Sequence, residues 1–372
     1  MNMRHGVGAL VLVSLAIWAV PAAAQGPTPL TPPAPRAAPE PAAKPATRKP
    51  ASEAAKEAAK PKPAAPAATK PAATIPAAKP AAAAPHGDAD MAYGAYQRGY
   101  YMTAFAIATR RVEQDGDVKA MTLLGELYAN GWGVPTDDTK AAEWYRLAAE
   151  RGDRQAMFAL AMFHLGGRGG PANREQGAKL LAGAAKLGHA PAAYDLGLLY
   201  LEGQLFPQDF ARAAELFATA AQAGIPEAQY ALATLYKEGR GVAQDLGQAA
   251  RLLAAAALAD NTDAQVEYAI ALFNGTGVAR DEHAAVALLR KAARKGSPIA
   301  QNRLANVLAI GRGVDADPIA AIKWHIVAKS GGVGDIPLDT FMQKQTPEVR
   351  AAGEKAAKPW VDALKELRDS RS

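Results

Sequence analysis

The chain has 372 residues, of which 49% are hydrophobic, and it contains no cysteine. This composition excludes disulfide frameworks, thiolate zinc sites and a cysteine nucleophile. The net charge of +6 is uneven, because residues 1–87 hold ten basic and three acidic residues, whereas the remainder holds 32 basic and 33 acidic ones. A uniformly basic surface is therefore unsupported, and we expect no nucleic-acid partner.

Residues 1–24 have the pattern of an export signal. Arg4 and His5 precede an apolar run over residues 6–20, and three alanines then end at Ala24, before Gln25. The run is shorter than the roughly 20 residues that a membrane-spanning helix needs. We expect cleavage around Ala24–Gln25 and a periplasmic or secreted protein. The alternative is that an uncleaved N-terminus anchors the chain in the inner membrane.

Residues 25–87 consist almost wholly of alanine, proline and lysine. Such a composition offers too little bulky apolar surface to offset the entropy of ordering, so the segment is predicted to be a disordered linker. Its simplest role is that of a spacer. Its basic charge leaves a second role open, as a tether to an anionic surface such as peptidoglycan or lipid headgroups.

Residues 88–117 are expected to form an N-terminal capping helix pair. An apolar helical segment spans residues 102–112, and Gly116 lies where a helical unit would end. The terminal units of repeat proteins are usually atypical because one side faces water.

Residues 118–333 repeat with a period of 36. Alanine recurs at 120, 156, 192, 228, 264 and 300, and glycine recurs at 131, 167, 203, 239, 275 and 311. Six copies in register, without insertion or deletion, indicate one structural unit that is stacked six times.

Each unit is predicted to be a helix, a glycine-rich loop and a second helix. In the first copy Ala120, Leu123, Leu124 and Leu127 have the spacing of one helix face, and Gly131 ends that helix. A short acceptor side chain recurs where the second helix would start, at Asp137, Asn173, Asp209, Asp245, Asp281 and Asp317. The expected fold is an all-α, right-handed solenoid of stacked antiparallel helix pairs.

Residues 334–372 break the period and are expected to form C-terminal capping helices. Thr346-Pro347-Glu348 is a strong helix start, with a capping side chain and proline at the first position. Pro359 predicts a kink in that helix.

The repeated unit resembles the Sel1-like repeat, a relative of the tetratricopeptide repeat. The residues that match the family pattern in the first copy are Ala120, Leu124, Gly125, Leu127, Tyr128, Gly131, Gly133, Val134, Asp137 and Ala141. The pattern is broken in the third loop, residues 204–207, and at Asp260, which occupies a glycine position. The resemblance implies a scaffold that assembles protein complexes.

No catalytic constellation is recognisable in the sequence, and we expect no enzyme activity, no cofactor and no metal site. His164 and His325 occupy positions that hold aromatic residues in other copies, so they are interpreted as core residues. Gly131 and Gly133 follow a helix rather than a strand, and no Walker lysine accompanies them, so they indicate a turn rather than a phosphate-binding loop.

A third row of positions on the first helices lies nearly opposite the core face, at about 100° per residue. These positions are polar in the outer copies, for example Glu126 and Asn306, and largely apolar in the middle ones. The candidate partner-binding residues are Phe158, Met162, Tyr194, Leu198, Leu201, Tyr230, Val266, Ile270 and Phe273. First helices normally line the concave side of such solenoids, so the row predicts an apolar groove for a protein or peptide. The alternative is that neighbouring units bury these side chains.

The sequence thus favours an exported scaffold or adaptor that binds a protein in its concave face. A second reading is an envelope factor that binds peptidoglycan or another polysaccharide. An enzyme is the least favoured reading, because no convergent ionisable groups are recognisable.

Overall fold

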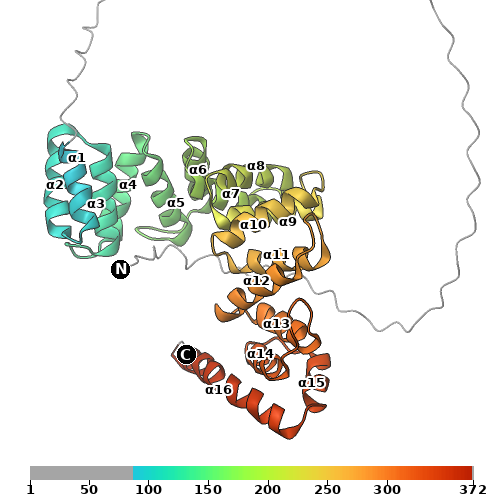
Figure 1. The fold of residues 1–372 in the computed structure, drawn as a ribbon. Helices are drawn as coiled ribbons and strands as arrows, with labels where there is room; N and C mark the ends of the chain where they lie inside the picture. Colours follow the sequence, from blue (N-terminus) through green and yellow to red (C-terminus); the bar gives the residue numbers. More distant parts are fainter. Residues whose placement is uncertain (1–86, 371–372) are drawn as a thin grey trace, which may run out of the picture. The chain divides into compact units, whose positions relative to one another are not determined.

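The computed structural model describes residues 87–370, and every regular element in this part is a helix (Figure 1). The helices are α1 (Gly87–Gln97), α2 (Tyr101–Asp115), α3 (Val118–Asn130), α4 (Asp138–Glu150), α5 (Arg154–Gly166), α6 (Arg174–Lys186), α7 (Ala190–Glu202), α8 (Phe210–Gln222), α9 (Pro226–Glu238), α10 (Leu246–Leu258), α11 (Thr262–Asn274), α12 (Glu282–Arg294), α13 (Pro298–Ile310), α14 (Pro318–Ser330), α15 (Ile336–Gln343) and α16 (Pro347–Asp369). The predicted all-α solenoid is confirmed. The expected signal, its cleavage at Ala24–Gln25 and most of the expected linker lie outside the described residues.

Helices α3 to α14 form six pairs, and each helix has 13 residues. The first helix of the first pair ends at Gly131, whose φ of 68° is the left-handed conformation that favours glycine. The N-cap of the second helix is Asp137, whose side chain accepts a hydrogen bond of 2.9 Å from the backbone N–H of Lys140. The predicted capping positions act in the same way in the other copies, at Asn173, Asp209, Asp245, Asp281 and Asp317.

Alanine columns allow the helices to pack closely. Each second helix packs against the first helix of its own pair and, from α4 to α12, against the first helix of the next pair, whereas α14 packs against α16. The column of the second helices is fully buried in all six copies, at Ala148, Ala184, Ala220, Ala256, Ala292 and Ala328. Larger side chains at these positions would overfill the seam between the helices.

The first pair is preceded by α1 and α2, which three residues join. The loop of the first pair reaches this N-terminal cap, because the indole of Trp132 stacks on the ring of Tyr101 with 5.2 Å between centroids. Tyr96 also donates a hydrogen bond to the carboxylate of Glu126 on α3. Side chains of the cap and of the first pair therefore form one continuous core.

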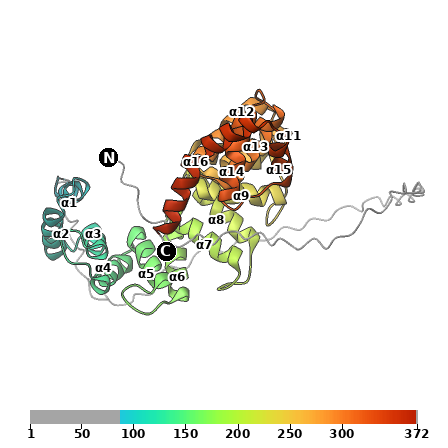
Figure 2. The same cartoon turned by 90° about the horizontal axis from the view of Figure 1, so that it is seen from below.

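At the other end, α16 lies along α14 (Figure 2). Trp360 packs edge-to-face on Trp324, with 5.0 Å between the ring centroids, and Lys323 Nζ lies 4.4 Å from the Trp324 ring. The predicted cap of α16 is present, since Thr346 Oγ1 accepts a hydrogen bond from the backbone N–H of Val349. The helix is continuous through Pro359.

Within the described residues, no helix combines the length and the apolar character needed to cross a bilayer.

Candidate partner-binding face

The nine predicted partner-binding residues come from four successive first helices, α5, α7, α9 and α11; we call them the apolar row. Seven of them are half-buried: Phe158, Met162, Tyr194, Leu198, Leu201, Tyr230 and Ile270. Val266 and Phe273 are only 5% and 7% exposed and belong to the core. The row is therefore more covered than the angular arithmetic of an isolated helix predicts.

Position on the helix alone does not explain this cover. On α9 the exposed residues are Glu227, Lys237 and Glu238, and Tyr230 is half-buried although it lies on the same side of the helix as Lys237, at about 100° per residue. In α11 the next loop supplies part of the cover, because the guanidinium of Arg312 lies 4.8 Å from the Phe273 ring centroid.

The two tyrosines of the row are the best defined of its members. The ring of Tyr194 packs 5.7 Å from that of Phe217 on α8. Burial raises the pKa of Tyr194 to about 12, and the neighbouring carboxylates of Glu227 and Asp195 add to the effect. Tyr230 is shifted in the same way, also to about 12, by burial first and by acidic neighbours second. Both phenols therefore stay protonated and can donate a hydrogen bond at physiological pH.

Phe158 packs on His189, with 4.7 Å between the ring centroids. His189 is the N-cap of α7, since its Nδ1 accepts a hydrogen bond from the backbone N–H of Ala192. Its Nε2 lies 2.9 Å from Gln155 Oε1 on α5. Burial, and secondarily Arg154, lowers the pKa of His189. This cap was not predicted, although Asp153 occupies the same position one copy earlier and is a recognisable capping residue.

Asp195 on α7 is a second residue near the row that was not predicted from the sequence. It follows Tyr194 directly, and burial raises the pKa of its carboxyl to about 6. Among the described residues no cation pairs with it. The signal in the sequence was weak, because the equivalent positions hold alanine at Ala159 and Ala231.

The polar ends of the row have a structural explanation. On α13, Asn302 and Asn306 each donate a hydrogen bond of 3.0 Å to Asp335 Oδ2, at the start of α15. On α3, Glu126 accepts the hydrogen bond from Tyr96 of the N-terminal cap. The row positions in the outer copies therefore bind the two end caps.

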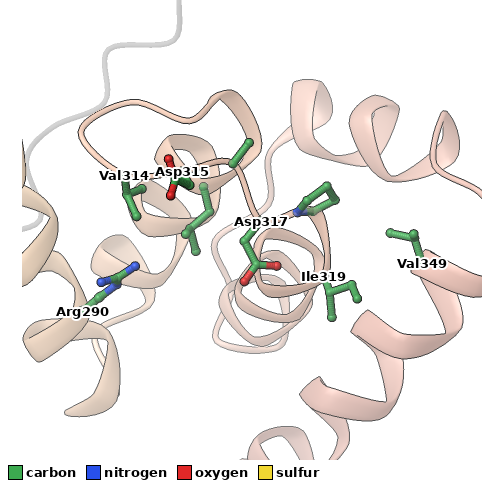
Figure 3. A pocket seen from close by; sticks show the side chains of 9 residues that line it. Arg290, Val314, Asp315, Asp317, Ile319 and Val349 are labelled. Atoms are coloured by element: carbon green, nitrogen blue, oxygen red, sulfur yellow. The ribbon is translucent and has the colours of Figure 1, made fainter.

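A separate cleft of 450 Å³ lies away from the apolar row, between α12, the loop of the sixth pair and the starts of α14 and α16 (Figure 3). Arg290 of α12 and Asp315 of the loop lie on one side, and Ile319 and Val349 lie on the other. Asp317, which also lines it, caps α14 through the backbone N–H of Ala320. The described residues contain no group of three or more histidine or acidic side chains placed to hold a metal ion.

The two histidines that the sequence placed in the core, His164 and His325, differ in burial. His325 is 1% exposed, and its Nε2 lies 2.7 Å from Asp339 Oδ1 on α15. His164 is half-buried on α5.

Comparison with known proteins places these features in a family. No curated protein matches the sequence. A crystal structure of a protective antigen of uropathogenic Escherichia coli, which displays an SLR fold, is 26% identical with a TM-score of 0.64. The match covers 74% of this chain and 62% of the antigen, so the chain spans less than two thirds of that protein.

A Sel1 repeat protein from Oxalobacter formigenes is 25% identical, with a TM-score of 0.56. That match covers 65% of this chain and 96% of the Oxalobacter protein. The family model of the Sel1 repeat matches six consecutive segments, residues 118–153, 154–189, 190–225, 226–261, 262–297 and 298–333. These segments make up more than half of the sequence, and the chain therefore belongs to the Sel1 repeat family.

Proposed function

We propose that this Sel1 repeat scaffold is exported and binds a segment of another protein along the apolar row. The observation that supports the proposal is the contrast along the row. Where an end cap covers these positions they are polar and hydrogen-bonded, as at Asn302 and Asn306. Between the caps, on α5 and α7, they hold partly exposed aliphatic and aromatic side chains, and on α9 the half-buried Tyr230 is accompanied by the polar Thr234 and Lys237.

The chemistry of the row suits a peptide or a helix rather than a small molecule. Half-exposed leucine and isoleucine side chains can lose their remaining contact with water when an apolar face docks on them. Tyr194 and Tyr230 add rigid rings with a polar tip, a side-chain type that is enriched in binding hot spots. Asp195 beside them supplies a desolvated carboxylate that a cationic group of the partner would stabilise.

The proposed role is binding rather than catalysis. The export part of the proposal rests on the sequence pattern of residues 1–24, with its basic start, apolar run and small residues before Gln25. Mass spectrometry of the mature protein tests it, because a peptide that begins at Gln25 is expected in the periplasmic or secreted fraction. An intact N-terminus in the membrane fraction would support the anchored alternative.

The binding proposal is tested with a photo-crosslinking amino acid at Leu198 in intact cells, followed by identification of the adduct. We expect a specific protein adduct that is lost in the Tyr194→Ser/Tyr230→Ser variant while the melting temperature stays near that of the parent. A matched control is Tyr93→Ser/Tyr100→Ser, which changes two exposed tyrosines of the N-terminal cap and should keep the adduct.

Two outcomes would overturn the binding proposal. A large fall in melting temperature for Tyr194→Ser/Tyr230→Ser would show that the row is core. Retention of the adduct in a folded Tyr194→Ser/Tyr230→Ser variant would place the contact elsewhere. Sedimentation with purified sacculi tests the alternative that the protein binds peptidoglycan. If deletion of residues 25–86 abolished the sedimentation, the binding would be assigned to the basic N-terminal segment.

A further inference from the structure

The first and second helices of the middle pairs carry charge of opposite sign. The first helices α7, α9 and α11 hold six acidic residues and one basic one, namely Asp195, Glu202, Glu227, Glu238, Asp263 and Glu267 against Lys237. The second helices α8, α10 and α12 hold five basic residues and two acidic ones, namely Arg212, Arg251, Arg290, Lys291 and Arg294 against Glu215 and Glu282. The first helices on either side, α5 and α13, hold no acidic residue. The negative charge therefore lies on the three helices that carry most of the apolar row.

Half of these six carboxylates have no cation of their own. Three of the six already lie within 3.2 Å of a cationic side chain: Glu202 of Arg174, Glu238 of Arg240, and Glu267 of Lys237. The other three, Asp195, Glu227 and Asp263, form no ion pair and no side-chain hydrogen bond with any residue between 87 and 370. Their charge is available to a further cation.

Asp195 lacks the cation that its equivalent in a later copy has. Asp195 and Glu267 occupy the same position in copies that are two apart. Glu267 pairs with Lys237, which lies 30 residues earlier on the preceding first helix, whereas the corresponding residue before Asp195 is Leu165. Asp195 is half-buried, so its carboxylate has lost part of its hydration without gaining a counter-charge. The structure thus leaves one cation missing beside Tyr194.

The other two unpaired carboxylates lie beside the tyrosines of the row. Burial is the main cause of the raised pKa of both phenols, and acidic side chains of the following first helix add to it. Glu227 has this effect on Tyr194, and Asp263, together with the paired Glu267, has it on Tyr230. Glu227 and Asp263 are both exposed. A cationic side chain that approached here would meet a carboxylate and an aromatic ring together, and both attract it.

We propose that the partner of the apolar row is a basic amphipathic segment, which places apolar side chains on the row and lysine or arginine side chains against Asp195, Glu227 and Asp263. The inference rests on the proposed function and gives the partner a chemical class. Burial of the apolar side chains supplies most of the affinity, and the carboxylates select a partner of the opposite charge. An uncharged segment of the same shape leaves the half-buried carboxylate of Asp195 without a counter-charge and binds less tightly.

Two synthetic helical peptides of equal length test the proposal on the full chain. One contains leucine and lysine in an amphipathic pattern, and the other has glutamine in place of every lysine. In titration calorimetry at low salt we expect the leucine–lysine peptide to bind at least about tenfold more tightly than the leucine–glutamine peptide. In about 1 M NaCl, where the Debye length is about 3 Å, the difference should shrink to about threefold or less.

A triple variant identifies the carboxylates that cause the difference. Asp195→Asn/Glu227→Gln/Asp263→Asn removes the three unpaired charges and keeps the shape of each side chain. It should weaken binding of the leucine–lysine peptide about tenfold and leave binding of the leucine–glutamine peptide unchanged. Thermal unfolding of the variant accompanies the titration, because Glu227 and Asp263 also stabilise the starts of α9 and α11.

A matched variant controls for net charge. Glu143→Gln/Glu175→Gln/Glu215→Gln removes the same charge from exposed positions on the second helices α4, α6 and α8. It should leave the affinity for the leucine–lysine peptide within about twofold of the parent, because these positions lie off the first helices. Equal weakening by the two triple variants would show that net charge, rather than the row, attracts the peptide, and would overturn the inference.

Two further outcomes overturn the inference. The first is a leucine–lysine peptide that does not bind the unaltered chain, or binds no more tightly than the leucine–glutamine peptide, and this comparison needs no variant. The second is a protein adduct from the crosslinker at Leu198 that persists in the folded Asp195→Asn/Glu227→Gln/Asp263→Asn variant. That adduct would leave the proposed function in place, because the row would then bind its partner without help from these charges.

Discussion

The ring of Phe217 on α8 occupies the space where a side chain at Gly197 on α7 would stand, since a β-carbon there would lie 2.7 Å from the ring. Gly125 and Tyr145 have the same relationship in the first pair, at 2.6 Å. In the copies that have leucine in place of the aromatic residue, the glycine position holds alanine, as in Ala233 opposite Leu253. The two positions therefore compensate in volume across each pair.

This compensation predicts coupling between the two positions. Gly197→Ala should destabilise the fold by about 1–3 kcal/mol, because overpacking against the ring exceeds the gain in helix propensity. Adding Phe217→Leu should recover at least about 1 kcal/mol relative to the sum of the two single changes. Denaturant unfolding of the four members of the cycle measures the coupling.

The exchange in the opposite direction is the control for that cycle. Ala233→Gly/Leu253→Phe gives the fourth pair the combination found in the third and should fold with a stability near that of the parent. Strict additivity in both cycles would mean that the two positions are independent and that the compensation is accidental.

The fold was predictable because each copy repeats the same local signals. Apolar spacing, the glycine at position 131 and the capping side chain at position 137 identify the helices without any knowledge of their neighbours. Volume compensation such as that of Gly197 with Phe217 was not identified, because it depends on which positions face one another across two helices.

The candidate site was predictable only in part. The periodicity locates the row on the first helices, but it does not show how far adjacent parts of the chain bury these side chains. Val266 and Phe273 are buried for that reason. The hydrogen bonds from Asn302 and Asn306 to Asp335 were not predicted, because Asp335 belongs to the non-repeating C-terminal segment, where no period guides the prediction.

The close approach of Gly277 to α10 predicts a strong effect of a single methyl group. Gly277 and Gly296 both have positive φ, so alanine at either position costs about 1–2 kcal/mol for the left-handed backbone. At Gly296 nothing lies within 4 Å of the added atom, whereas at Gly277 it would lie 1.9 Å from the Leu246 carbonyl oxygen. Gly277→Ala should therefore cost about 1–3 kcal/mol more than Gly296→Ala in denaturant unfolding. Equal costs would show that the loop moves aside freely.

Asp260 explains how a non-glycine residue fills a glycine position. Its φ is 70°, and its carboxylate accepts hydrogen bonds from Lys291 in the last turn of α12 and from Lys295, the C-cap of that helix, which lower the pKa of Asp260. Asp260→Ala should lower the melting temperature, because alanine keeps the strained backbone and loses both partners. Asp260→Gly relieves the backbone and should lie nearer to the parent. A melting temperature of Asp260→Ala equal to that of Asp260→Gly would contradict this account.

The contacts that hold α15 against α13 and α14 should weaken in acid. Burial by itself would raise the pKa of Asp335, but hydrogen bonds from Asn306, Asn302 and the Leu338 N–H outweigh it and hold that pKa below its usual value. Hydrogen bonds from Lys329 and His325 also lower the pKa of Asp339 on the same helix.

A carboxyl with a lowered folded pKa stabilises the docked state fully above its unfolded pKa, about 3.9, and less as the pH falls through the folded value. Amide exchange of α15, corrected for intrinsic rates, should therefore lose protection between about pH 5 and pH 3. Asp335→Asn/Asp339→Asn should lower the protection already at neutral pH and remove most of its pH dependence. Asp362→Asn, which alters an exposed ion pair with Lys358 on α16, is the matched control and should leave the profile of α15 unchanged. If the double variant still lost amide protection in α15 as the pH falls, groups other than these two carboxylates would hold α15 in place.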